Sequence, residues 1–119
     1  MSAHTDLDAD TSEPSAVVLV LTTLPVDADA EAFAETFVGE RLAACVSIGG
    51  PVTSVYRWRG AIERAGERQL LVKTVRGKVP LLKARLAALH PYDVPELIVL
   101  QAVDGGEAYF AWVRESAAG

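Results

Sequence analysis

The sequence predicts an α+β fold made of two β-α-β halves joined by a long hairpin. Four runs of β-branched and apolar residues are separated by turn residues, and two stretches between them repeat apolar residues at helical spacing. Two of the strands, near the middle of the chain, follow one another with only a tight turn between them. The order β-α-β-β-α-β, with one more helix at the end, describes a ferredoxin-like sandwich with a long central hairpin and an extra C-terminal helix.

Length and charge indicate one domain preceded by a tail. Residues 1–15 hold four acidic residues and no Lys or Arg, which predicts a disordered acidic tail before a single domain at residues 16–119. That domain carries 12 acidic and 11 basic residues, and without a basic stripe it is not expected to bind nucleic acid. We find no apolar run long enough for a membrane span and no apolar leader, so we expect no membrane partner and a cytoplasmic location.

The first half of the domain is expected to form a strand, a helix and a second strand. The continuous apolar run from Ala16 predicts a central strand. Asp27 is the expected N-cap of the helix, because its side chain can accept from the first free N–H groups. The helix is expected to run to about Ala44, and residues 45–48 to form a short strand that ends at the Gly-Gly-Pro break, residues 49–51. Apolar residues at helical spacing support the helix: Phe33, Phe37, Val38 and Leu42.

The central hairpin is long for so small a domain. Alternation over residues 52–58 predicts its first strand, and Arg59-Gly60 supplies the turn. The return strand is expected to start at Ala61, to be interrupted at Ala65-Gly66 by a bulge or a second kink, and to resume over residues 69–75. The charged residues near the tip are interpreted as a solvated or intersubunit ion-pair surface: Arg57, Arg59, Glu63, Arg64, Glu67 and Arg68.

The second half is expected to form a helix, a strand and a short terminal helix. Gly77 is the expected start of the first helix, with Pro80 in its first turn and His90-Pro91 as its end. Residues 97–103 predict a strand, and residues 109–113 the terminal helix. Both longer helices would cover one face of the sheet and leave many apolar strand residues bare on the other. Exposed apolar surface of that extent marks an interface, so we expect an oligomer.

Five motifs stand in register along the domain: Glu40-Arg-Leu-Ala-Ala-Cys45, Ser54-Val-Tyr-Arg-Trp-Arg-Gly60, Leu71-Val-Lys-Thr74, Leu89-His-Pro-Tyr-Asp-Val-Pro-Glu96 and Trp112. Together they cover roughly residues 17–113, and the chain resembles the CutA family of divalent-cation tolerance proteins. The resemblance implies a ferredoxin-like subunit and a homotrimer in which the long hairpins of neighbouring subunits pair. It also implies a non-enzymatic role in the response to metal ions.

The family name directs attention to metal ligands. Family members proposed to bind copper have a Cys in the first strand and a His-His pair before the Pro-Tyr motif, and here those positions hold Thr22, Leu89 and His90. With Cys45 as the one cysteine, the domain satisfies the preferences of neither Cu(I) nor Cu(II). We therefore expect copper or another divalent cation to bind weakly through His90. The alternatives are a helix-terminal His90 bonded to a carbonyl, and Cys45 as a small inert core residue.

A second candidate site is a cleft between subunits. Lys73 interrupts an apolar strand and needs a polar partner wherever it is buried. We expect it to bind a small anionic ligand in a cleft shared with Tyr92, Glu96, Tyr56 and Trp58. The alternative is structural: Lys73 reaches water or pairs with a carboxylate such as Glu96, and the aromatic residues pack at the trimer interface.

These features support two main hypotheses of function. The first is a trimeric, non-enzymatic divalent-cation tolerance protein, with weak copper binding and no other cofactor. The alternative is a trimeric sensor that binds a small molecule in its intersubunit clefts, which rests on analogy of fold. A third hypothesis is an enzyme built on Lys73, Glu96 and Tyr92. It ranks last, because the chain shows no Ser-His-Asp or Cys-His arrangement and no phosphate loop.

Overall fold

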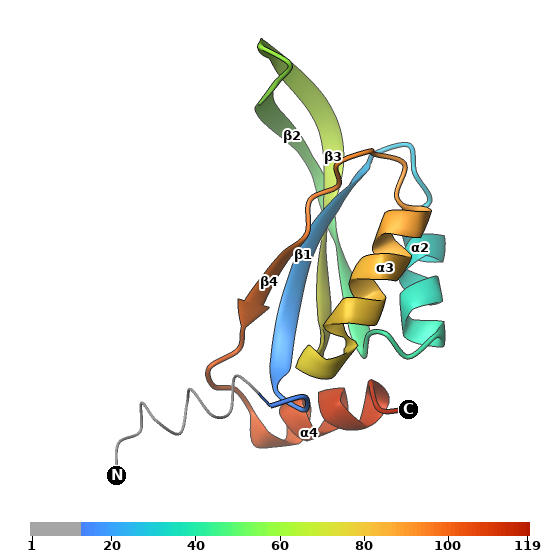
Figure 1. Cartoon of the computed structure of the whole chain (residues 1–119), viewed down its shortest axis with the longest axis vertical. Helices are drawn as coiled ribbons and strands as arrows, with labels where there is room; N and C mark the ends of the chain where they lie inside the picture. Colours follow the sequence, from blue (N-terminus) through green and yellow to red (C-terminus); the bar gives the residue numbers. More distant parts are fainter. Residues whose placement is uncertain (1–12) are drawn as a thin grey trace.

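The chain folds as one antiparallel sheet with helices on one face and at one end (Figure 1). The computed structural model describes residues 13–119, so most of the predicted tail lies outside the described residues. The strands, in sheet order β2-β3-β1-β4, are β1 Val17–Pro25, β2 Cys45–Trp58, β3 Ala61–Val75 and β4 Ile98–Gln101. The helices are α2 Ala30–Gly39, α3 Val79–Leu89 and α4 Glu107–Ser116, with a 3-10 turn at Arg76–Lys78. The α+β prediction with a long hairpin and a C-terminal helix is confirmed.

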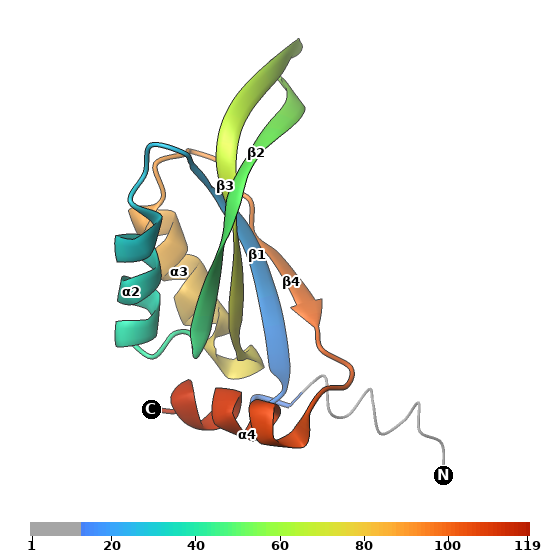
Figure 2. The same ribbon diagram turned by 180° about the vertical axis from the view of Figure 1, so that it is seen from behind.

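The main core lies between the sheet and the two helices α2 and α3. Val20 on β1 and Val72 on β3 pack with Phe37 of α2 and with Leu82 and Leu86 of α3, and all five side chains are almost fully buried. Figure 2 shows both helices on the same side of the sheet. Close packing here makes truncation of a side chain such as Phe37 cost about 3–5 kcal/mol.

Helix α2 begins and ends at other residues than the sequence predicts. Its N-cap is Asp29 and not Asp27, because the Asp29 carboxylate accepts a 3.0 Å hydrogen bond from the Ala32 N–H. The helix stops at Gly39, well short of Ala44. Arg41 adopts a left-handed backbone with φ of 58°, which turns the chain out of the helix.

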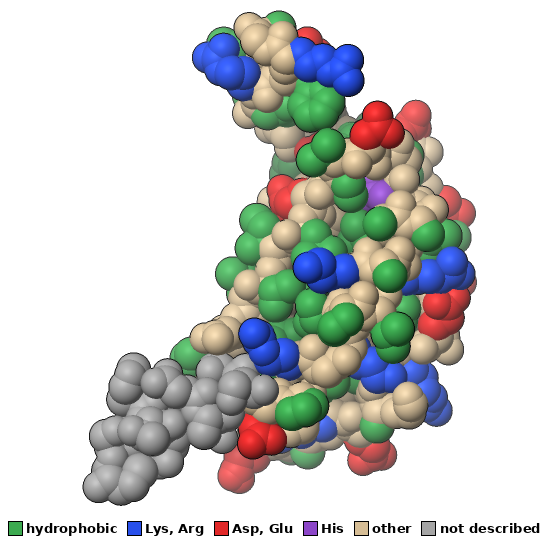
Figure 3. All heavy atoms as spheres, viewed as in Figure 1, with side chains coloured by type: hydrophobic (Ala, Val, Ile, Leu, Met, Phe, Trp, Pro, Cys, Tyr) green, Lys and Arg blue, Asp and Glu red, His purple; other side chains and the backbone are tan. Residues whose placement is uncertain are grey.

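The hairpin is more regular than predicted. Strands β2 and β3 pair from Cys45 to Trp58, and the one shift of register between them lies between Ile48 and Pro51. The Gly-Gly-Pro segment is therefore a bulge within a continuous strand and does not end it. The predicted interruption at Ala65-Gly66 was wrong, since both residues pair in register with β2. Arg59 and Gly60 both have positive φ, which fits the tight turn that closes twisted hairpins. The tip stands clear of the body and carries basic side chains (Figure 3).

The second half also differs from the prediction at its element ends. The 3-10 turn precedes α3, which begins at Val79 and not at Gly77. The helix ends at Leu89 as predicted, because His90 takes an extended backbone before Pro91. Strand β4 is shorter than predicted, and α4 is longer.

The face of the sheet opposite α2 and α3 carries apolar residues that no helix covers. Alternation along β1 places Leu19 and Leu21 on this face, because Val20 between them points into the core. The pairing register puts Leu71, Ile98 and Leu100 beside them. Ile98 and Leu100 are 47% and 42% exposed. This apolar sheet face is the surface that the sequence predicts as an interface.

Candidate functional site

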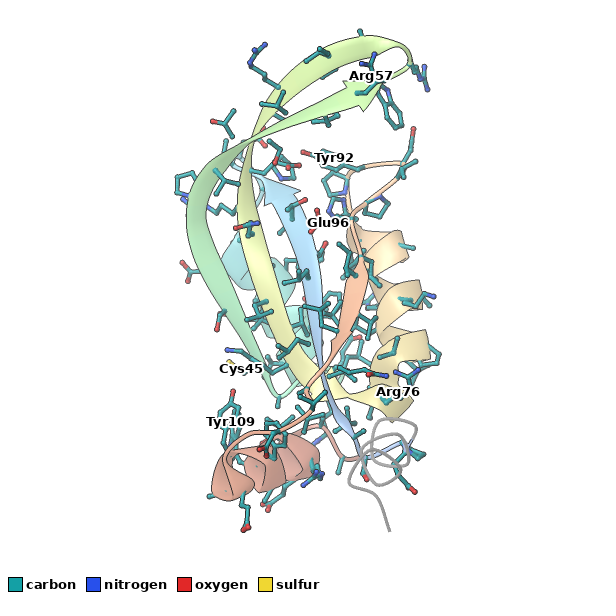
Figure 4. The ribbon with its side chains drawn as sticks, turned by 90° about the vertical axis from the view of Figure 1, so that its left-hand side faces the viewer. Cys45, Arg57, Arg76, Tyr92, Glu96 and Tyr109 are labelled. Atoms are coloured by element: carbon teal, nitrogen blue, oxygen red, sulfur yellow. The ribbon has the colours of Figure 1, made fainter. Side chains whose placement is uncertain are left out.

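A hollow of about 610 Å³ lies under the outer half of the hairpin, where the end of β1 meets the loop between α3 and β4. Figure 4 shows Tyr92 and Glu96 of that loop beneath the hairpin. The hollow brings together four of the five residues predicted for the cleft, namely Tyr56, Trp58, Tyr92 and Glu96. The remaining residues that line it are Thr23, Ser54, Val55, Glu67, Pro91, Asp93 and Val94.

His90 fixes the loop that forms one wall of the hollow. Its side chain is only 7% exposed, and its Nε2 lies 2.6 Å from the carbonyl oxygen of Thr23. The backbone N–H of Tyr92 donates to Nδ1 at 3.1 Å. Nδ1 must therefore hold the lone pair, so the proton is on Nε2, which donates to Thr23. His90 thus connects the loop to β1 and has no ring nitrogen free, as the carbonyl-bonded alternative for this residue expects.

Glu67 is a buried carboxylate on the floor of the hollow. Its side chain is 7% exposed, the Tyr92 hydroxyl donates to Oε2 at 2.9 Å, and the Thr23 hydroxyl lies 3.5 Å from the same oxygen. Burial, followed by the hydrogen bond to this carboxylate, raises the pKa of Tyr92 to about 12. Tyr92 therefore remains a phenol that donates to Glu67 throughout the physiological pH range.

The sequence analysis missed Glu67. It was interpreted as part of a solvated ion-pair surface near the hairpin tip, and the structure places it under the loop instead. Within the described part of the chain the ion pair that forms is Glu40 with Arg85, and no Lys or Arg pairs with Glu67. The alternation of β3 gives no signal for it, because Leu70, Val72 and Thr74 mark the buried face and Glu67 lies on the other one. Its burial depends on where the loop after α3 crosses the hairpin, which the sequence does not reveal.

Lys73 lies elsewhere on the sheet. Its Nζ is 2.6 Å from Ser47 Oγ and 3.7 Å from Cys45 Sγ, and it is not among the residues that line the hollow. Six residues of extended strand separate it from Glu67, a distance of about 20 Å. Lys73 and Glu96 therefore do not meet within one chain, and their association in a cleft between subunits stays a prediction. Cys45 is half-buried beside Lys73 on the apolar sheet face rather than in the core.

Residues 13–119 contain no group of three or more His, Cys, Asp or Glu side chains close enough to hold a metal ion. Thr22 is buried, and its hydroxyl has no hydrogen-bond partner within these residues. A metal that binds His90 would have to displace either the Thr23 carbonyl from Nε2 or the Tyr92 N–H from Nδ1. A separate finding is that none of the described helices has the length and apolar character of a membrane span.

Comparisons with known proteins give consistent matches. The family model described as CutA1 divalent ion tolerance protein matches residues 18–116. The divalent-cation tolerance protein CutA of Thermus thermophilus is 46% identical over 98 residues, which are 82% of this chain and 95% of that protein. A Yersinia pestis protein of the same name is 40% identical over 116 residues, covering 93% of this chain and 97% of that protein. The crystal structure of CutA from Xylella fastidiosa superposes with a TM-score of 0.82 at 41% identity, covering 86% of this chain and 98% of that one. These names describe tolerance to divalent cations and no enzyme activity.

Proposed function

Because the chain belongs to the CutA1 divalent ion tolerance family, we propose that it acts as a homotrimer of ferredoxin-like subunits in metal-ion tolerance, without catalysing a reaction. The observation that carries the trimer is the apolar sheet face, on which Ile98 and Leu100 remain 47% and 42% exposed. A monomer would leave this apolar surface in water, and closed symmetry would cover it once on every subunit.

The proposed trimer also bears on the environment of the Lys73 side chain. The residue lies on the apolar sheet face, paired in register with Cys45 and Leu19. An interface over this face would bury its ammonium group, and the Ser47 hydroxyl at 2.6 Å is a polar partner already in place. Light scattering should give about three times the chain mass of 12.7 kDa. A monomer at micromolar concentration would contradict the proposal.

The tolerance role is tested in cells. Expression of this chain in a bacterium that lacks its own family member should restore growth on toxic copper or zinc. The matched control is a variant that stays monomeric. Equal growth with and without the chain would contradict the role, whatever the mass of the purified protein.

Copper binding, where it occurs through His90, is proposed to be weak. Both ring nitrogens are engaged, so a metal must replace one hydrogen bond in a buried position. Calorimetry should show an affinity that is lost in His90→Gln, a variant that keeps a donor for the Thr23 carbonyl. Tight binding that survives the substitution would place the metal elsewhere.

One observation favours the second candidate function, a small-molecule sensor. The hollow has the size of a small-ligand site and is lined by both aromatic and charged residues. A thermal-shift screen of metabolites tests this candidate, because a ligand that binds the folded chain raises its melting temperature.

A further inference from the structure

A trimer needs two different surfaces on each subunit. Three-fold symmetry is closed by a head-to-tail contact, in which one patch of a subunit meets a different patch of the next. The apolar sheet face supplies one patch, and Glu67 lies on the same face of β3 as Leu71, because they are four positions apart along the strand. The hollow is therefore the hairpin end of that face. A subunit that covers the apolar sheet face also covers the hollow, so the residues of the hollow indicate what the covering subunit carries.

The lining of the hollow requires a positive partner from the covering subunit. It holds three carboxylates, Glu67, Asp93 and Glu96, and no Lys or Arg. Asp93 and Glu96 are exposed, whereas Glu67 is buried and accepts from the hydroxyls of Tyr92 and Thr23. An apolar surface laid over these groups would remove carboxylates from water without compensation, which is costly.

The outer end of the hairpin carries a surface of complementary charge. Arg57 lies opposite Ile62 across the two strands, and alternation along β3 places Arg64 on the same face as Ile62. All three side chains are exposed, Ile62 to 62%. None of the three lines the hollow of its own chain, whereas Tyr56 and Trp58, which alternate with Arg57 along β2, do. We call Arg57, Ile62 and Arg64 the outer hairpin face.

The outer hairpin face has no ionic partner in its own subunit. In the part of the chain that the structure describes, neither Arg57 nor Arg64 takes part in a salt bridge. Glu63 stands opposite Tyr56 and so projects from the other face of the hairpin. The tip that carries both arginines stands clear of the body (Figures 1 and 3). Several other cations already have a partner within the chain: Arg68 donates to the Gly49 carbonyl, Arg85 to Glu40 and Arg114 to the Ser15 carbonyl.

We infer that the outer hairpin face of one subunit packs onto the hollow of the next, with Ile62 over its apolar and aromatic lining and the two arginines paired with its carboxylates. Guanidinium groups suit this role because they bind carboxylates through two parallel hydrogen bonds. Repeated three times, the contact closes the ring, and the arginines of each neighbour complete the hollow. The inference rests on the proposed homotrimer and specifies which two surfaces of the chain meet.

Reversal of charge on either surface tests the pairing. Arg57→Glu/Arg64→Glu and Asp93→Arg/Glu96→Arg should each weaken assembly by about a hundredfold or more, because like charges then meet in the interface. The chain that carries all four substitutions should regain the trimer, since its charges are exchanged and not removed. Light scattering over a series of protein concentrations measures assembly, and circular dichroism confirms that each variant is folded.

Two exposed cations outside the hairpin provide the matched control. Arg76→Glu/Lys83→Glu changes the net charge as much as the hairpin variant does and should assemble like the wild type. A trimer that tolerates reversal of either surface, an equal loss in the control, or a folded fourfold variant that stays dissociated would overturn the inference and leave the homotrimer standing. A monomeric wild type would overturn both.

Cross-linking tests the contact without changing its charges. In a Cys45→Ser background, Ile62→Cys and Val94→Cys each place one thiol on one proposed surface, since Val94 lines the hollow and is 68% exposed. The two variants are co-expressed so that mixed trimers form, and a link between them must then join two subunits. A flexible bismaleimide should give covalent dimers from the mixture and none from either variant alone. Folded trimers without this link, or dimers from Ile62→Cys alone, would overturn the inference.

Discussion

The Tyr92 hydroxyl donates a 2.9 Å hydrogen bond to the buried carboxylate of Glu67 and so ties the loop after α3 to the hairpin. The two residues are 25 positions apart in the sequence. The backbone N–H of Tyr92 also donates to Nδ1 of the His90 side chain. Together the two hydrogen bonds hold the loop that forms one wall of the hollow against β1 and β3. The loop is therefore positioned by polar contacts to buried groups, and its geometry should respond to changes in those groups.

The first prediction concerns alkaline pH. The pKa of Tyr92 is raised to about 12, above the value near 10 of an unfolded chain. The stabilisation from this phenol is therefore complete below about pH 10 and is lost as the pH rises toward 12. Denaturant unfolding from pH 8 to 12 should show this loss in the wild type and a smaller loss in Tyr92→Phe. Tyr109→Phe, on the exposed side of α4, is the control and should behave as the wild type does.

At neutral pH, Tyr92→Phe should lower the free energy of unfolding by about 1 kcal/mol, because Glu67 loses its shortest hydrogen bond. Absorbance at 295 nm offers an independent check. One tyrosine of the wild type should ionise last, and that late step should be missing in the variant. A full set of early-ionising tyrosines would contradict the contact.

The second prediction concerns His90 as a structural connection. His90→Ala removes the donor to the Thr23 carbonyl and the acceptor for the Tyr92 N–H. One buried and one partly buried polar group are then left unpaired, so the free energy of unfolding should fall by about 2–4 kcal/mol. His90→Gln keeps a donor and should lose about half as much. Denaturant melts of the two variants measure the loss of unfolding free energy in each. Equal losses would show that the packing of the ring, and not its hydrogen bonds, explains the effect.

The order and type of the elements could be predicted from the sequence because each depends on local pattern. The β-branched run of β1 and the proline after His90 act on their own neighbours. The ends of elements depended on more distant contacts. Helix α2 stops at Gly39 because Arg41 turns left-handed, and the N–H groups of Leu42 and Ala43 both then reach the carbonyl of Phe37.

The candidate site was predicted in part for the same reason. Tyr56 and Trp58 share one face of a strand by alternation, and Tyr92 and Glu96 flank a rigid proline corner, so local pattern indicates both pairs. The place of Lys73 depends on the strand register, which sets it beside Ser47. The burial of Glu67 depends on the path of the loop above it. The local sequence pattern predicts neither the strand register nor the path of the loop.

The third prediction concerns residues 13–15. The carbonyl of Pro14 accepts from the Gly77 N–H at 2.9 Å, and the carbonyl of Ser15 accepts from Arg114 Nε at 3.0 Å. A chain that starts at Ala16 should therefore unfold about 1–2 kcal/mol more easily than one that starts at Glu13. Thermal melts of the two truncated chains measure the difference. Identical melting temperatures would show that these contacts contribute nothing to stability.

The last prediction tests the apolar sheet face directly. Leu100, on edge strand β4, is 42% exposed and lies in register with Leu19. If this face is buried between subunits, Leu100→Lys places a charge in an apolar interface, where it costs several kcal/mol per subunit. Light scattering should then show monomer where the wild type gives trimer. The control is Leu81→Lys, because Leu81 is 60% exposed on α3, on the opposite side of the sheet. That variant should keep the wild-type mass, and dissociation by both substitutions, or by neither, would contradict an interface on this face.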